Sequence, residues 1–176
     1  MTGVKTLKDA EEAILLGAAA IGIKMGYGKD DVHPETAREI FFSLPVFISR
    51  VGIFCDEKRY HIQELVTFCR LDTLHFCGQE QPDDVKRYPE NVIKNFSPQS
   101  LSQVKDYDIQ GVILELTQGI FMNIEVETIT NPALILCGNL THTEWVRAIK
   151  KYRPYGIQWD LNNNSRKILE DLLFRK

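Results

Sequence analysis

The sequence lacks the features of several specialised protein classes. It contains no run of about 18 apolar residues, the length that a membrane-spanning helix needs, and residues 1–12 do not form the charged-then-apolar leader of a secreted protein. Positive charge is not in excess, because 21 lysines and arginines face 24 aspartates and glutamates. The net charge of -3 excludes a strong positive field for nucleic acid or an acidic membrane. We therefore expect a cytoplasmic protein whose partners are neither nucleic acids nor membranes.

Cysteine is scarce, and its spacing favours neither a metal site nor a disulfide framework. The chain has no CxxC pair, and its four cysteines are widely separated: Cys55, Cys69, Cys77 and Cys137. Because they fall in expected strands and helices, we expect free thiols in the core, with a disulfide or a zinc site as the alternative. The histidines have no spacing typical of metal ligands. No metal and no cofactor is expected.

A β-α-β unit over residues 46–76 organises the rest of the chain. Residues 46–54 form a nearly continuous apolar run, which is typical of a parallel strand covered on both faces. In residues 57–70 apolar side chains recur at three- and four-residue spacing, which predicts an amphipathic helix. Residues 73–76 then form a second, short strand. Because a parallel strand pair needs such a crossover, the unit predicts an α/β fold.

Similar apolar segments alternate with helical patterns along the whole chain. Thr6 and Asp9 form a capping-box pattern before the first helix, Pro34 can open the second, and Thr141 or Thr143 can cap a later one. Eight strands are expected, at residues 3–5, 19–23, 46–54, 73–76, 91–96, 111–116, 133–137 and 156–161.

This alternation predicts a single α/β domain over residues 1–176, folded as a compact (β/α)8 TIM barrel. The chain is short for that fold, which usually needs about 200 residues or more, so its helices and loops must be trimmed. An open, doubly wound sheet is the alternative.

Several stretches of the sequence resemble one enzyme family. They are residues 6–22 (TLKDAEEAILLGAAAIG), 51–54 (VGIF), 71–80 (LDTLHFCGQE), 135–140 (ILCGNL) and 156–157 (GI). In their order and wording they are similar to phosphoribosylanthranilate isomerase, the barrel enzyme of tryptophan biosynthesis, over essentially the whole chain. The resemblance implies the barrel fold and an isomerase that acts on a phosphorylated, sugar-like metabolite.

The resemblance also implies candidate catalytic residues. The family's reaction is an Amadori rearrangement, in which an acid protonates the ribose ring oxygen, a Schiff base forms, and a base removes the C2 proton. Thr2 stands where the family has its thiol base, and a hydroxyl is a poor proton acceptor near neutrality. Glu115 stands where the family has its aspartate acid, and it keeps the carboxyl group with a longer reach.

Other positions implied by the resemblance concern the ligand. Asp30 stands where the family has a substrate-ordering arginine, and Cys77 where it has a histidine. Phosphate would be held by backbone amides in the turns after strands seven and eight. Asp160, just before the second of these turns, would repel phosphate if it pointed at it. The candidate residues of the two turns are Gly138, Asn139, Asn162 and Asn163.

Two functional classes remain open from the sequence. The first is an isomerase in which Glu115 acts as acid or base on a phosphorylated small molecule. The second is a non-catalytic relative that binds a metabolite or a protein partner, in which Glu115 is an ordinary solvent-facing carboxylate at a strand end. Either class is compatible with a monomer or a homodimer.

Overall fold

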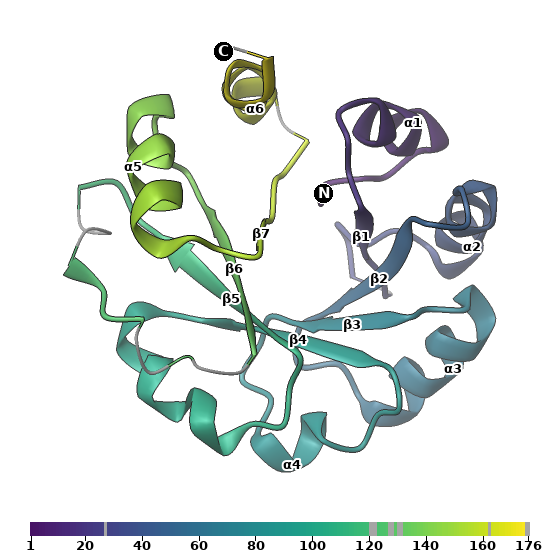
Figure 1. The fold of residues 1–176 in the computed structure, drawn as a ribbon. Coiled ribbons are helices and arrows are strands. Elements are labelled where there is room, and N and C mark those ends of the chain that lie inside the picture. The colour runs from purple at the N-terminus through teal and green to yellow at the C-terminus, as the bar shows by residue number, and fades with distance from the viewer. Residues whose placement is uncertain (27, 120–122, 127–128, 130–131, 162, 175–176) are drawn as a thin grey trace.

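The computed structural model describes residues 1–26, 28–119, 123–126, 129, 132–161 and 163–174 of the chain. Within them, seven parallel strands form one curled sheet in which each strand pairs with its neighbours in chain order (Figure 1). This sequential order is consistent with a TIM-type barrel, whereas the strand order of a doubly wound sheet would reverse. The strands are β1 Ala20–Lys24, β2 Ser49–Phe54, β3 Thr73–Phe76, β4 Asn91–Phe96, β5 Gly111–Leu116, β6 Ala133–Gly138 and β7 Gly156–Ile157.

The described helices lie on the outer side of the sheet (Figure 1). They are α1 Leu7–Leu15, α2 Pro34–Ser43, α3 Arg59–Cys69, α4 Pro82–Val85, the 3-10 helix η1 Pro98–Asp106, α5 His142–Tyr152 and α6 Asn163–Phe174. None of them is long and apolar enough to cross a membrane.

Three helix starts that the sequence predicts are confirmed, whereas the helix expected from residue 57 begins only at Arg59. The capping box of α1 is formed, because Asp9 N donates to Thr6 Oγ1 (3.2 Å) and Thr6 N donates to Asp9 Oδ2 (2.8 Å). Pro34 is the first residue of α2, and Thr141 is the cap of α5. Local sequence therefore decides where these helices begin.

The predicted first strand, residues 3–5, is wrong, and the described residues contain no eighth strand. Thr2 instead lies beside the residues that follow β7: its N–H donates to Trp159 O (2.7 Å), and it forms an isolated parallel bridge with Asp160. We call this junction between the two terminal segments of the chain the seam. Gly3 has a φ of 76°, a left-handed conformation that turns the chain towards α1. The extended segment before this turn is too short to count as a strand.

Two other predicted strands are shorter in the structure. The strand expected at residues 46–54 begins only at Ser49, because a turn precedes it. Val46 and Phe47 lie in this turn and are 91% and 93% exposed, so the prediction that they are buried is wrong. The strand expected at residues 156–161 ends after two residues.

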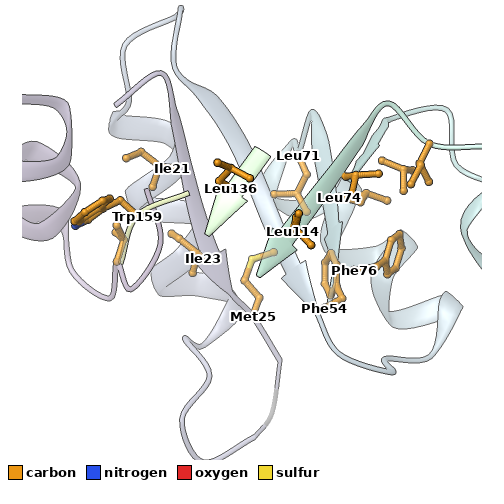
Figure 2. Close-up of a cluster of buried hydrophobic side chains, with 14 of the residues drawn as sticks. Ile21, Ile23, Met25, Phe54, Leu71, Leu74, Phe76, Leu114, Leu136 and Trp159 are labelled. Carbon is orange, nitrogen blue, oxygen red and sulfur yellow. The ribbon is translucent and has the colours of Figure 1, made fainter. Parts of the chain in front are cut away.

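Side chains alternate along each strand between two environments. One set packs between the sheet and the helices and forms the hydrophobic core, with members such as Ile21, Ile23, Phe54, Leu74, Phe76, Leu114 and Leu136 (Figure 2). The other set faces the barrel interior and helps to line a cavity of about 560 Å³; its members include Gly22, Val51, His75, Ile93, Ile113, Ile135 and Gly156. Because side chains alternate with a period of two, the residue two positions after each of these also faces the interior. These later residues lie at the carboxyl end of the barrel.

Candidate active site at the carboxyl ends of the strands

The predicted acid Glu115 lies at the end of the barrel where enzymes of this fold carry their catalytic groups. It is exposed, whereas its neighbours Leu114 and Leu116 are buried. It stands two positions beyond Ile113, which lines the interior cavity. By the same alternation, its interior-facing companions at the carboxyl ends of other strands are Lys24, Asn95 and Cys137.

Glu115 has a thiol as its neighbour on the next strand. Glu115 and Cys137 are paired in register between β5 and β6, and paired residues of parallel strands project to the same face. Burial, with a smaller contribution from the Glu115 charge, raises the pKa of the Cys137 thiol to about 12. Cys137 is therefore protonated near neutrality and cannot serve as a thiolate base.

Thr2, the second predicted catalytic residue, is hydrogen-bonded to Asp160. Its Oγ1 lies 3.3 Å from both Asp160 Oδ2 and Trp159 O, the two acceptors within reach of its one hydroxyl hydrogen. Gly3 leaves the space for this carboxylate, since a Cβ at Gly3 would lie 2.7 Å from Asp160 Oδ1. The structure thus places a carboxylate, which can accept a proton, beside a hydroxyl that accepts one poorly.

A polar pair of β3 and β4, the buried His75 and the half-buried Asn95, was not foreseen as a pair from the sequence. His75 Nε2 lies 2.6 Å from Asn95 Oδ1. Burial lowers the pKa of His75 to about 4, although the hydrogen bond to Asn95 acts in the opposite direction. The imidazole is therefore neutral near pH 7. The signals in the sequence were His75 and Asn95 themselves, polar residues within the strands expected at residues 73–76 and 91–96.

The loop after β1 carries the predicted ligand residue Asp30 and, beside it, Asp31. Asp30 is exposed in a turn, whereas Asp31 lies against the end of β1. Lys24 Nζ is 3.0 Å from Asp31 Oδ1, and Gly28 N donates to Asp31 Oδ2 (3.0 Å). The structure therefore joins Asp31, and not Asp30, to a cation at the carboxyl end of the barrel.

The turn after β6 is shaped by Gly138. Its φ is 138°, and a Cβ there would lie 2.2 Å from Leu116 O, so only glycine fits. Asn139 follows and is exposed. The first amides of α5 are partly occupied by its own cap, because Thr141 N donates to Glu144 Oε2 (2.9 Å) and Glu144 N to Thr141 Oγ1 (3.3 Å).

The second predicted phosphate turn is only partly visible. Asn162 lies outside the described residues, and Asn163 is the first residue of α6.

The same described ranges hold no candidate metal site. They contain no group of three or more histidine, cysteine, aspartate or glutamate residues that could hold an ion.

Cys77 is bonded to Cys55 in a disulfide, so the expectation of four free thiols is wrong for this pair. In the register of β2 and β3, Phe54 lies opposite Phe76, 22 residues later in the sequence. Cys55 and Cys77 directly follow these two residues and have the same separation of 22. They therefore leave adjacent strands side by side, which the sequence pattern alone did not reveal. The expectation of free, buried thiols is confirmed for Cys69 and Cys137.

Comparison with known proteins identifies the lineage, although no family model matches the chain. The phosphoribosylanthranilate isomerases of Desulforamulus reducens and Geotalea uraniireducens are each 32% identical to it, over 88% of this chain and 80% and 83% of theirs. The solved isomerase of Thermus thermophilus is 27% identical, with a TM-score of 0.68 over 89% of this chain and 83% of its own.

A further solved neighbour agrees in fold. It is a phosphoribosyl anthranilate isomerase in complex with reduced 1-(o-carboxyphenylamino)-1-deoxyribulose 5-phosphate, 22% identical, with a TM-score of 0.79 over 97% of this chain and 94% of its own. The curled parallel sheet, the sequence identity and the extent of the matches lead to one conclusion. The chain belongs to the phosphoribosylanthranilate isomerase family.

Proposed function

We propose that the protein catalyses the isomerisation of N-(5'-phosphoribosyl)anthranilate, with Glu115 as the general acid. The observation that carries this proposal is the exposed carboxyl group of Glu115 at the carboxyl end of β5, on the interior-facing side. Protonation of the ribose ring oxygen opens the ring and gives a Schiff base, from which loss of the C2 proton leads to the ketose product. Positioned acid–base groups contribute roughly 10²–10⁴-fold to such steps.

Asp160 is the group that we propose as the base. The resemblance puts the family's thiol at Thr2, and the carboxylate of Asp160 lies within hydrogen-bond distance of the Thr2 hydroxyl. A carboxylate accepts a proton far better than a neutral hydroxyl does. In this proposal Thr2 is a positioning residue that orients the carboxylate.

Phosphate binding would use the turn at Gly138 and Asn139, together with Asn162 and with Asn163 at the start of α6. Backbone N–H groups at a helix start favour an anion. The Thr2 hydroxyl is hydrogen-bonded to Asp160 Oδ2. This bond favours an orientation in which the Asp160 carboxylate points towards Thr2 and does not repel the phosphate. The proposed reaction uses metabolites of the cytoplasm, so a cytoplasmic location stays part of this proposal.

The non-catalytic alternative also has an observation in its favour. Thr2 lacks the thiol of the family, and the sulfur of Cys77 is held in a disulfide. In this alternative the barrel binds a metabolite without converting it.

Turnover of N-(5'-phosphoribosyl)anthranilate by the purified protein separates these two functions. We expect measurable turnover in the wild type, a loss of about 100-fold or more in Glu115→Gln, and no change in Glu64→Gln, an exposed carboxylate on α3. Calorimetry with reduced 1-(o-carboxyphenylamino)-1-deoxyribulose 5-phosphate completes the test. Binding of this compound without any wild-type turnover would establish the non-catalytic alternative.

We also propose a homodimer that forms through the face at the amino ends of the strands. Val46 and Phe47 project there, more than nine-tenths exposed. Ser49, two residues after Phe47, donates its N–H to Ala19 O (3.0 Å), and Ala19 lines the apolar interior cavity. Light scattering that finds a wild-type dimer and a monomeric Val46→Ser, Phe47→Ser variant would support this; a wild-type monomer would refute it.

A further inference from the structure

The Cys55–Cys77 disulfide stands at the carboxyl end of the barrel, directly after β2 and β3. Cys55 is exposed, and Cys77 is partly buried. The bond is therefore open to reagents from solvent and lies at the same end of the sheet as Glu115. An exposed disulfide is a site where thiols can exchange.

A buried ion pair holds the same two segments together independently of the sulfur atoms. Lys94 Nζ donates to Glu80 Oε2 (2.6 Å) and to Gly78 O (2.9 Å). The other oxygen of Glu80, Oε1, accepts from Asp56 N (3.0 Å) and from Gly78 N (3.2 Å). We call Glu80 and Lys94 the clamp; both are more than nine-tenths buried.

The clamp contacts the residues that follow the two cysteines, Asp56 after Cys55 and Gly78 after Cys77. A further bond joins the segments, because Gln79 N donates to Asp56 Oδ1 (2.6 Å). These hydrogen bonds do not depend on the S–S bond. They hold the backbone segments next to the two cysteines together without it.

We propose that Cys55–Cys77 is a thiol–disulfide exchange site for small thiols of the glutathione class, and that the clamp keeps the reduced cysteines in place for re-oxidation. The proposal concerns the redox chemistry of this pair alone. It does not depend on the isomerase function.

The exchange proceeds in two balanced steps. A small thiol loses its proton, and its thiolate attacks Sγ of the exposed residue Cys55; the S–S bond breaks, and Cys77 leaves as a thiolate that takes up a proton. A second thiolate then attacks the outer sulfur of the mixed disulfide and releases Cys55, which is protonated in turn. Two small thiols are oxidised to their disulfide, and the protein disulfide is reduced to two thiols.

The reduced state has a stabilising contact ready. Cys77 Sγ lies 3.3 Å from Phe54 O, so its S–H can donate to that carbonyl. The other two cysteines serve as internal controls, because burial raises the pKa of Cys69 to about 11 and that of Cys137 to about 12. Low thiolate content and burial make both unreactive in the folded protein.

The first test measures the redox equilibrium of the folded, full-length protein. The protein is equilibrated in mixtures of reduced and oxidised glutathione, alkylated without denaturant and analysed by peptide mass spectrometry. We expect Cys55 and Cys77 to change together and reversibly, while Cys69 and Cys137 stay unlabelled. Two permanently free thiols in oxidised glutathione, or a disulfide that excess reduced glutathione cannot open in the folded protein, would overturn the exchange site.

The second test concerns the clamp. Glu80→Gln removes the ion pair, and we expect it to lower the equilibrium constant for disulfide formation about tenfold or more, since the cysteines lose effective concentration. Asp83→Asn removes the exposed ion pair with Lys86 on the adjoining α4 and should change nothing. Lys94→Gln, which keeps the Glu80 bonds to Asp56 and Gly78, is measured beside it.

The outcomes for the clamp are distinct. A wild-type equilibrium constant in both folded variants would refute its role and leave the exchange site standing. If Glu80→Gln does not fold, the equilibrium constants of Lys94→Gln and Asp83→Asn are compared instead. An equilibrium constant for disulfide formation that is unchanged in Lys94→Gln would then refute the role of the clamp. Neither test uses the isomerase substrate, so a failure of the proposed function would not affect either result.

Discussion

The hydroxyl of Thr2 donates a hydrogen bond to the carboxylate of Asp160, 3.3 Å away, across the seam between the N-terminal and C-terminal segments of the chain. The two residues are 158 positions apart in the sequence. The seam thus brings a carboxylate to the position that the family resemblance assigns to a thiol. This contact supports a replaced base and not merely a lost one.

Replacement of Asp160 by asparagine tests the proposed base. The amide still accepts the Thr2 hydrogen bond but cannot take a proton, so kcat should fall about 100-fold or more with little change in KM. Thr2→Val, which removes only the orienting hydroxyl, should cost less. Steady-state kinetics of both variants check this. An Asp160→Asn enzyme as fast as the wild type would show that another group removes the proton.

Gly138→Ala should destabilise the protein by about 2–3 kcal/mol. The new Cβ would meet Leu116 O at 2.2 Å, and the φ of 138° is strained for any other residue. Gly156→Ala is the matched control, since nothing lies within 4 Å of its Cβ position. Urea unfolding of both variants measures the difference. Equal midpoints would contradict the strain argument.

Lys94→Met should destabilise the protein by about 3–5 kcal/mol, because it leaves the Glu80 carboxylate buried without its cation. The side chains of Lys94 and Glu80 are only 5% and 6% exposed. Lys86→Met removes an exposed pair with Asp83 and should cost about 0–1 kcal/mol. Chemical unfolding at pH 7 tests this contrast. A loss of only about 0–1 kcal/mol of unfolding free energy in Lys94→Met would contradict it and would mean that water reaches the clamp.

His75 should make the protein less stable as the pH falls from 6.5 to 4. Burial depresses its pKa from 6.5 to about 4, so in this range the unfolded chain binds a proton that the folded protein does not. The loss approaches about 3 kcal/mol near pH 4 and vanishes above pH 6.5. In His75→Gln this part of the pH dependence should disappear. Unfolding free energies at several pH values decide, and an unchanged slope in the variant would contradict the assignment.

Several elements of the fold follow from short stretches of sequence. The strands at residues 73–76, 91–96 and 111–116 have the predicted bounds, and Thr6, Pro34 and Thr141 open helices as expected. Periodicity and capping are local properties, so the sequence reports them directly. The exposed Val46 and Phe47 mark the limit of this reasoning, because an apolar run does not say which of its residues are covered.

The candidate site depended on contacts that local patterns do not contain. Glu115 could be assigned to a strand end from its neighbours, but its pairing with Cys137 required the register of β5 and β6. Register likewise decided that Cys55 and Cys77 meet. A shift of one residue would have turned these side chains to the other face.

By itself, the sequence determined the α/β class, the bounds of three strands, the starts of three helices and the family resemblance, because each rests on patterns within short stretches of the chain. Only the tertiary structure decided the seven-stranded sheet, the disulfide, the clamp and the Thr2–Asp160 contact. These depend on how segments 14 to 158 residues apart are brought together. The physical reason is that register and closure are set by packing across the whole sheet, and no single segment encodes them alone.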